Sequence, residues 1–405
     1  MQTLIAFALV LVLISIATVR YRLNPFVTLF SAAIVYGVLA GVPAESVVGT
    51  AAEGAGKIFA LLGVVVFAGS VIAKVLEKGK FQERIFSDLR AFTHRPALTG
   101  GIAGFILAVP FMCCITAFIV ISPLLSCFAD KKKAIYGAAI GSTLSFSLIY
   151  PTPVTIAAAS AVQGFSAGEY MAVALPLSLV LLVAVGMVIG RQKSAAEGGD
   201  QVCAPEVGRR AWIPLLLPLA LTAAAVVWPV FGKGSISVAL LVGMAGALLV
   251  LAPDLRYAAL KDGTKHAGVI IYDLCGAGAF GATIMASTFA TDAFALFGDA
   301  VPAVLVPFLL GVLLQAAQGS RVVTAVITAS MVLSSDYATA IGQIPLMLMI
   351  AAGTLSISAF SDPFFWVVRN TSGDPVQEVL WRYALPLSAA SLVIAAVAVA
   401  IEMGV

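Results

Sequence analysis

The chain has 405 residues, of which 61% are hydrophobic and only 11% are charged. A soluble domain carries about 25% charged residues, so this chain lacks the charge to cover its surface in water. The formal net charge of +3 gives no basic field for nucleic acid, and no two of the five cysteines form a CxxC pair that would indicate a zinc site. The composition therefore favours a membrane protein.

Apolar runs of about 20 residues, the length that crosses a bilayer, follow one another along the chain. They lie near 2–19, 26–43, 57–76, 134–162, 168–190, 211–231, 235–252, 266–289, 345–368 and 383–402. The first run ends at Arg20 without a small-residue cleavage site, so we interpret it as a membrane helix and not as a removed signal. The sequence predicts an all-α, polytopic membrane protein.

Two further apolar stretches, about 97–128 and about 301–333, are too long for one simple span. Each is interrupted near its middle by Pro or Gly together with polar residues, at 110–116 and at 315–321. Backbone that leaves a helix at membrane depth must face protein or water. A re-entrant hairpin, which enters and leaves on one side of the membrane, explains both the length and the interruption.

The distribution of Lys and Arg favours this layout. With the N-terminus outside and both hairpins re-entrant, the inner loops hold all of the 23 Lys and Arg residues except Lys57, Lys233 and Arg321. This asymmetry is the positive-inside pattern, whereas a first hairpin that crossed the membrane would place Lys131–Lys133 outside. We expect a multi-pass protein of a bacterial or archaeal inner membrane, with both termini on the outer, periplasmic side.

The two halves of the sequence repeat each other. Ser142–Ser147 reads STLSFS and Gly353–Ser358 reads GTLSIS, and Ile115–Ala117 loosely matches Val323–Ala325. Each half contains three helices, a hairpin, a broken helix and a final helix, and an odd number of crossings inverts the second half. Inverted repeats with interrupted helices are typical of secondary transporters.

This pattern predicts three segments. The first inverted repeat is expected over 1–190, with its hairpin at about 97–128 and its broken helix at about 134–162. A cytoplasmic linker is expected over 191–210. The second repeat is expected over 211–405, with its hairpin at about 301–333 and its broken helix at about 345–368.

Polar residues inside the membrane gather at the two helix breaks and the two hairpin tips. Prolines such as Pro153 and Pro363 remove backbone donors, so each helix should break there. Half-helix N-termini attract anions, and freed carbonyls and hydroxyls suit Na⁺ or water; hydroxyls that only bond back to their own helix are the alternative. The expected substrate-binding residues are Arg321, Ser320, Gly319, Gln318, Thr116, Cys114, Ser145, Thr152, Ser358 and Ser361. The expected ion-coupling residues are Asp362, Thr143, Ser147, Thr354, Ser356 and Asp273.

Arg321 is the most informative of these side chains. A guanidinium at membrane depth is costly unless it is paired or wet, and its planar fork fits a carboxylate or a sulfonate. We interpret Arg321 as a substrate clamp, and a structural partner for Asp362 or Asp273 is the alternative. Asp362 lies in the second break, where it could carry a coupling proton or bind Na⁺. Asp273 is the weaker candidate, because it could be a solvated helix end near Lys265.

Nothing in the sequence indicates catalysis. The chain has no HExxH and no Walker A motif, and its GxGxxG at Gly276–Gly281 lies in an apolar run, where small residues permit close helix packing. His94 and His266 are expected at inner loop boundaries. We therefore expect no catalytic residue, no metal site and no cofactor, with Na⁺ only as the coupling ion if the protein uses it.

Several motifs resemble those of one family in order along the chain. Gly278–Gly281, Ala317–Ser320, Ser358–Val368, Val109–Met112 and Tyr150–Pro153 look like motifs of the gluconate permease (GntP) family of the ion transporter superfamily. The resemblance implies a homodimer that works by an elevator motion, with a scaffold of outer helices and a moving block of hairpins and broken helices.

Three positions depart from the family pattern. The family usually carries an Asp, a His and a small residue where this chain has Cys114, Thr152 and Arg321. Losing an acid and gaining an arginine makes the site more positive, which favours a more strongly anionic substrate.

The sequence thus predicts a symporter in the lipid bilayer that couples H⁺ or Na⁺ to a small organic anion. The expected anion is a carboxylate or a sulfonate, and gluconate-like hydroxy acids are candidates. A cation/proton antiporter or an anion exporter of the same superfamily is the alternative. A membrane-embedded enzyme is disfavoured because no nucleophile and base are placed at depth, and a non-transporting scaffold because it needs no doubled polar breaks.

Overall fold

A computed structural model describes residues 2–21, 23–93, 95–191, 207–228, 230–289, 291–292, 301–335, 337–359 and 361–404. Its elements are all helices, and no strand occurs among the described residues, which confirms the all-α class. Within these ranges five helices are long and apolar enough to cross a membrane. The protein is therefore described below as an integral membrane protein.

The first half begins with three helices and ends with a long one. Its elements are α1 (Gln2–Ser15), η1 (Ile16–Arg20), α2 (Pro25–Leu39), α3 (Ala44–Lys78), α4 (Phe81–Phe92), α5 (Pro96–Phe111), α6 (Cys114–Ile121), η2 (Ser122–Cys127), α7 (Lys131–Leu148), α8 (Pro153–Ala159) and α9 (Ala167–Arg191). The predicted linker, 191–210, falls largely outside the described residues.

The second half follows the same sequence of long and short helices. Its elements are η3 (Arg209–Trp212), α10 (Ile213–Val227), η4 (Gly232–Gly234), α11 (Ser235–Val250), α12 (Pro253–Met285), η6 (Ala303–Leu305), α14 (Val306–Gln318), α15 (Arg321–Leu333), α16 (Tyr337–Ala340), α17 (Gln343–Ser356), α18 (Pro363–Ser372), α19 (Val376–Val379), η7 (Leu380–Ala384) and α20 (Leu385–Glu402).

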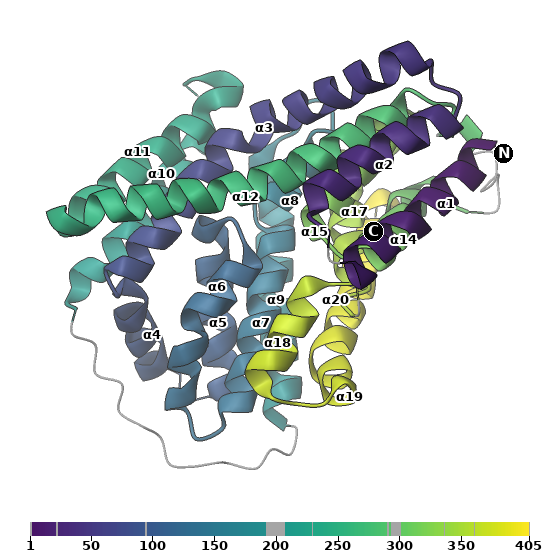
Figure 1. The fold of residues 1–405 in the computed structure, drawn as a ribbon. Coiled ribbons are helices and arrows are strands. Elements are labelled where there is room, and N and C mark those ends of the chain that lie inside the picture. The colour runs from purple at the N-terminus through teal and green to yellow at the C-terminus, as the bar shows by residue number, and fades with distance from the viewer. Residues whose placement is uncertain are drawn as a thin grey trace.

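The long helices α3 and α12 lie side by side across the top of Figure 1, and α2 packs beside α12. Small residues allow this contact, because a Cβ on Gly54 would lie only 2.4 Å from the Gly278 carbonyl oxygen. Gly278 belongs to the GxGxxG segment, whose glycines thus serve close packing as predicted. The helices α5, α7 and α9 run beneath this layer.

The centre of the molecule is formed by α7 and α17. Every residue of α7 from Ala134 to Leu148 is buried, as is every residue of α17 from Pro345 to Ser356. A helix that is apolar all round belongs in a protein interior. Each of these two helices is covered by a neighbouring helix: α5 packs on α7, and α14 packs on α17.

Glycines make both of these contacts close. A Cβ on Gly141 of α7 would lie 2.0 Å from the Gly101 carbonyl oxygen of α5, and a Cβ on Gly353 of α17 would lie 2.8 Å from the Gly311 Cα of α14. Close backbone approach through small residues is the usual way that membrane helices pack tightly. The same pairing therefore recurs in the two halves.

One helix was not predicted. Residues 81–92 are placed in an inner loop by the sequence, but they form α4, which buries Phe81, Ile85 and Phe86. Beside these residues Arg84 and Asp88 form an ion pair, 3.0 Å apart. The helix is thus amphipathic, with too narrow an apolar face to register as a membrane span.

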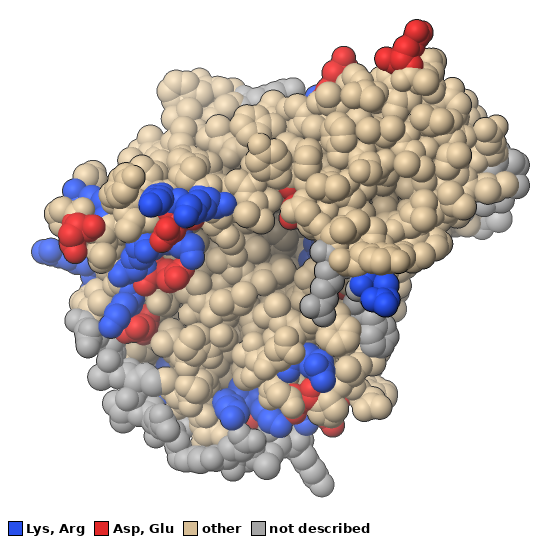
Figure 2. Space-filling view, in the orientation of Figure 1, with Lys and Arg blue, Asp and Glu red and all other residues tan. Residues whose placement is uncertain are grey.

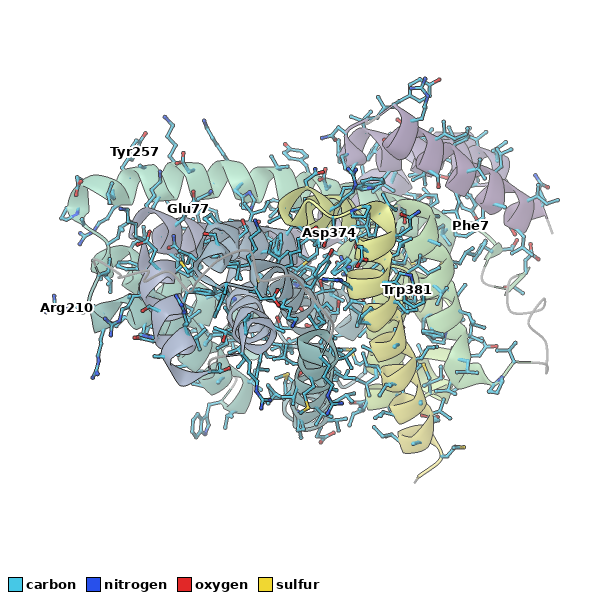
Figure 3. The ribbon with its side chains drawn as sticks, turned by 90° about the horizontal axis from the view of Figure 1, so that it is seen from below. Phe7, Glu77, Arg210, Tyr257, Asp374 and Trp381 are labelled. Carbon is cyan, nitrogen blue, oxygen red and sulfur yellow. The ribbon has the colours of Figure 1, made fainter. Side chains whose placement is uncertain are left out.

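Charged side chains are distributed unevenly over the surface. In Figure 2, lysines and arginines gather at the left end of the molecule and along its lower edge, whereas most of the upper right carries none. One contact near this basic side joins the two halves: Asp374 accepts hydrogen bonds from Lys132 Nζ (2.7 Å) and Tyr136 OH (2.8 Å). Seen from below in Figure 3, Asp374 lies where the C-terminal helices meet the rest of the molecule.

Candidate functional site

The helix interruptions of the two halves meet at the centre of the structure. In the first half α7 ends at Leu148 and α8 begins at Pro153, and in the second α17 ends at Ser356 and α18 begins at Pro363. Proline begins each downstream helix, where its missing N–H costs nothing. The Thr354 hydroxyl lies 3.4 Å from the Ser147 hydroxyl, so the two similar Thr-Leu-Ser-x-Ser segments are in contact.

The tip between α14 and α15 is held by a buried glutamine. The side-chain amide of Gln315 donates from Nε2 to the Gly319 carbonyl oxygen (2.9 Å) and accepts at Oε1 from the Thr324 hydroxyl (2.9 Å). The backbone carbonyl oxygen of Gln315 accepts from the Ser361 hydroxyl (3.2 Å). Gly319 has a positive φ of 73°, and a Cβ there would lie 1.9 Å from the Ser361 carbonyl oxygen. Only glycine fits this position, where the tip presses against the second helix break.

Arg321 is the first residue of α15 and is only 4% exposed. Its Nη2 atom donates to Asp362 (2.7 Å), to the Ser358 hydroxyl (2.8 Å) and to the Tyr383 hydroxyl (3.1 Å). Its Nε atom is buried and has no hydrogen-bond partner among the described residues. The guanidinium is thus anchored at one end and keeps an unused donor, which is uncommon for a buried polar group.

Asp362 is 1% exposed and serves two partners. Besides the ion pair with Arg321, its Oδ1 accepts from the backbone N–H of Phe364 (2.9 Å) and caps the N-terminus of α18. Both partners favour the ionised carboxylate, because one is a cation and the other lies at the positive end of a helix dipole. The burial cost of each charge is thereby offset.

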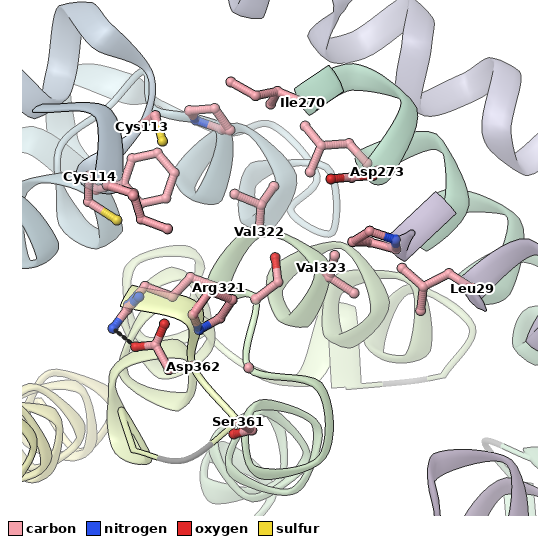
Figure 4. A pocket seen from close by; sticks show the side chains of 18 of the residues that line it. Leu29, Cys113, Cys114, Ile270, Asp273, Arg321, Val322, Val323, Ser361 and Asp362 are labelled. Atoms are coloured by element: carbon pink, nitrogen blue, oxygen red, sulfur yellow. Dashed lines mark hydrogen bonds and ion pairs between the residues drawn. The ribbon is translucent and has the colours of Figure 1, made fainter. Parts of the chain in front are cut away.

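These groups line a cavity of about 740 Å³. Figure 4 shows Arg321 joined to Asp362 on one side of the cavity and Asp273, from α12, on another. The lining combines the tip after α14, the second break, the tip between α5 and α6, and apolar residues of α1 and α2. The cavity is mostly apolar and offers few charges, which is typical of a small-molecule site.

The structure places five of the ten expected substrate-binding residues in the cavity wall: Cys114, Gly319, Ser320, Arg321 and Ser361. A sixth, Ser358, contacts Arg321 directly. The side chain of Gln318 lies outside the described residues.

The other three expected substrate-binding residues are satisfied elsewhere. Thr116 lies 3.0 Å from His266 Nε2, Ser145 lies 3.5 Å from the Ser142 carbonyl oxygen, and Thr152 donates to the Phe146 carbonyl oxygen (2.7 Å) and caps α8. None of them lines the cavity. Their hydroxyls therefore stabilise the tip and the break.

The six expected ion-coupling residues fall into two groups. Asp362 and Asp273 line the cavity. The hydroxyls of Thr143, Ser147, Thr354 and Ser356 lie in α7 and α17, where Thr143, Thr354 and Ser356 donate back to their own helices. Thr143 also lies 3.4 Å from the Tyr383 hydroxyl and so reaches the Arg321 cluster indirectly.

Tyr383 and Gln315 are site residues that the sequence did not single out. Tyr383 comes from η7, a π-helical turn at the start of the last apolar run, and nothing in its sequence surroundings marks it. Gln315 lies at the predicted interruption and was detectable as a buried amide. His266 contacts Thr116 inside α12, and His94 lies outside the described residues.

Within the described ranges no group of three or more His, Cys, Asp or Glu side chains is arranged to hold a metal ion. A buried guanidinium and two carboxylates face one cavity, and they can hold an anion, a proton or a monovalent cation.

Comparison with known proteins gives consistent matches. The sequence model of GntP family permeases matches residues 1–206 and 210–404. An uncharacterized permease of Haemophilus influenzae is 23% identical over 92% of this chain and 86% of its own length. The high-affinity gluconate transporter of Escherichia coli is 23% identical over 92% of each chain. The crystal structure of the YdaH transporter of Alcanivorax borkumensis shares the fold, with a TM-score of 0.60, 16% identity and 89% of each chain covered.

Proposed function

This protein belongs to the GntP family of permeases, and we propose that it is a secondary active transporter in which H⁺ or Na⁺ drives symport of a small organic anion. A permease is a transporter and not an enzyme, as the sequence predicted. The observation that carries the proposal is Arg321, a buried guanidinium in the cavity wall whose Nε donor has no partner among the described residues.

The substrate class follows from the shape and charge of Arg321. A guanidinium presents parallel donors that match the two oxygens of a carboxylate or sulfonate. An oxyanion that reaches Nε would satisfy it without displacing Asp362 from Nη2. The named activity of the Escherichia coli relative makes gluconate and similar hydroxy acids the first candidates.

We further propose that the protein is a homodimer and that transport proceeds by an elevator motion within each subunit. The recurring contacts of α5 with α7 and of α14 with α17 support an inverted repeat. The moving block would comprise these helices with α6, α8, α15 and α18, and the scaffold would include the long pair α3 and α12. A homodimer through the scaffold would hold it fixed while the block slides.

The proposed orientation places both termini, and the acidic side chains at the upper edge of Figure 2, outside a bacterial or archaeal inner membrane. The gathering of lysines and arginines toward the opposite edge supports this orientation. Cysteines introduced singly at Glu45 and Arg210 would test it, because an impermeant maleimide added to intact cells should label only the first. Labelling of Arg210→Cys alone would contradict the orientation.

The transport proposal is tested in two steps with the purified full chain. Thermal unfolding is first measured with gluconate, malate and isethionate, with and without Na⁺, and a bound anion should raise the unfolding temperature. Proteoliposomes loaded with an anion that binds are then tested for exchange against its labelled form. No binding or exchange of any organic anion, together with exchange of Na⁺ for H⁺, would favour a cation/proton antiporter instead.

A further inference from the structure

Asp273 is a carboxylate that forms no ion pair with any residue the structure describes. It lies on α12 and lines the same cavity as Arg321 and Asp362, and Figure 4 shows its side chain directed toward the middle of that cavity. The backbone amide of Phe26 interacts with the carboxyl group, but Oδ1 is buried and has no hydrogen-bond partner among the described residues.

Among the described residues, the charged and titratable groups around Asp273 do not offset a negative charge there. Arg321 from α15 is already paired with Asp362 from α18, 2.7 Å away. The tip between α5 and α6 contributes Cys113 and Cys114, and the lining residues of α1 and α2 are apolar. Helix α3 contributes no residue to the lining, and its Lys78 pairs with Asp262 near the start of α12.

On α12 itself, His266 lies two turns before Asp273 and so on the same face of the helix. Its Nε2 atom is occupied by the Thr116 hydroxyl, 3.0 Å away. Within the described part of the chain, Asp273 is therefore the cavity carboxylate that has neither an ion-pair partner nor a helix to cap, in contrast to Asp362.

This contrast decides which carboxylate responds to an anion. With Arg321 and Asp362 mutually neutralised, an ionised Asp273 gives the cavity a net negative charge, which repels an incoming anion. A protonated Asp273 removes that charge and adds an O–H donor to the cavity wall. Each of the two ligands, anion and proton, then binds more tightly when the other is present.

We propose that Asp273 takes up one proton when the organic anion binds at Arg321, so that both occupy the cavity together. The inference rests on the proposed function and specifies the cation: it is H⁺, received by the carboxylate of α12. No covalent bond is made, and the proton moves from water to a carboxylate oxygen. Asp362 keeps its partners, Arg321 and the α18 N-terminus, when the anion binds.

The test is calorimetric titration of the purified full chain with gluconate, and in parallel with isethionate, across pH 5 to 8. Repeating each titration in buffers of different ionisation enthalpy gives the number of protons taken up per anion bound. Wild type should take up about one proton at the upper pH values, and its Kd should rise about tenfold per pH unit above the midpoint of the Asp273 titration.

Three variants separate the residues. Asp273→Asn should bind with no proton uptake and with a Kd that no longer depends on pH, because an amide imitates the protonated acid. Asp254→Asn is the matched control on the exposed start of the same helix, and His266→Gln tests the other titratable group on its face; both should keep the wild-type slope. Proton uptake by Asp273→Asn at the wild-type level would overturn the assignment, as would loss of the slope in His266→Gln.

Two further outcomes keep the proposals apart. If the wild type binds an anion without proton uptake, the transporter proposal stands and the assignment of Asp273 falls. If no organic anion of the unfolding screen binds to the wild type or is exchanged by it, the proposed function falls and the assignment with it. Should Asp273→Asn not fold, Asp273→Glu decides: a carboxylate one methylene longer should keep the proton uptake but shift its midpoint, and an unchanged midpoint would overturn the assignment.

Discussion

Replacing Arg321 by alanine should remove anion binding and weaken the fold at the same time. The guanidinium donates to three side chains, Asp362, Ser358 and Tyr383. Its loss leaves the carboxylate of Asp362, which is 1% exposed in the wild type, with the Phe364 N–H as its one remaining partner among the described residues. Removing one member of a buried ion pair costs about 3–5 kcal/mol, so the variant should unfold at a markedly lower temperature.

The loss of affinity has a separate origin. A hydrogen bond to a charged group contributes about 1.5–3 kcal/mol, and the anion gains one such bond from the unused Nε. Its loss corresponds to a Kd that is about tenfold to 150-fold higher. Arg321→Lys keeps the charge but not the planar fork, and should retain part of the affinity.

A double variant separates stability from binding. Arg321→Ala with Asp362→Ala leaves no lone buried charge, so its unfolding temperature should recover part of the loss, whereas its Kd should not recover. Arg382→Ala is the control, because it removes a guanidinium beside Tyr383 that pairs with Glu378 and not with the cavity. Wild-type affinity in Arg321→Ala, measured by calorimetry, would refute the clamp, and restored affinity in the double variant would show that Arg321 acts only by neutralising Asp362.

Three further predictions concern the residues that hold the site. Gly319→Ala should destabilise the protein more than Gly41→Ala. Both glycines have a positive φ, which costs a non-glycine residue about 1–2 kcal/mol, but of these two positions only Gly319 would bring the new Cβ into a clash with backbone. Equal shifts in unfolding temperature would contradict this. Tyr383→Phe should raise the Kd for the anion about tenfold to 150-fold, because it removes the hydroxyl that accepts a hydrogen bond from Arg321, worth about 1.5–3 kcal/mol, while Tyr257→Phe, at an exposed position, should not change it. Gln315→Leu removes the amide that hydrogen-bonds the Gly319 carbonyl and the Thr324 hydroxyl, which costs about 1–3 kcal/mol each. Adding Thr324→Val should therefore restore part of the lost unfolding temperature. No recovery would mean that the buried amide acts through other contacts.

The sequence by itself determined the helical class and the places where helices stop. Proline and glycine act on their own backbone: Pro153 and Pro363 begin helices and Gly319 ends one, whatever surrounds them. Charge at membrane depth is equally local, since the cost of burying Arg321 follows from the apolar residues around it in the chain. For the same reason the sequence could nominate Asp362 and Asp273 as candidates.

The tertiary structure decided how these groups are paired. Arg321 and Asp362 are 41 positions apart, and Tyr383 joins them from a π-helical turn without any sequence signal. Thr116, Ser145 and Thr152 look like site residues in the sequence, but their hydroxyls are used by His266 and by nearby carbonyl groups. The interpretation of Asp273 changed most between sequence and structure. The sequence ranks it below Asp362. The packing of α12 shows that it lines the same cavity as Arg321, without an ion-pair partner among the described residues. Hydrogen bonds and ion pairs act over about 3 Å, so which side chains form them depends on how distant elements pack, and that is fixed by the whole fold.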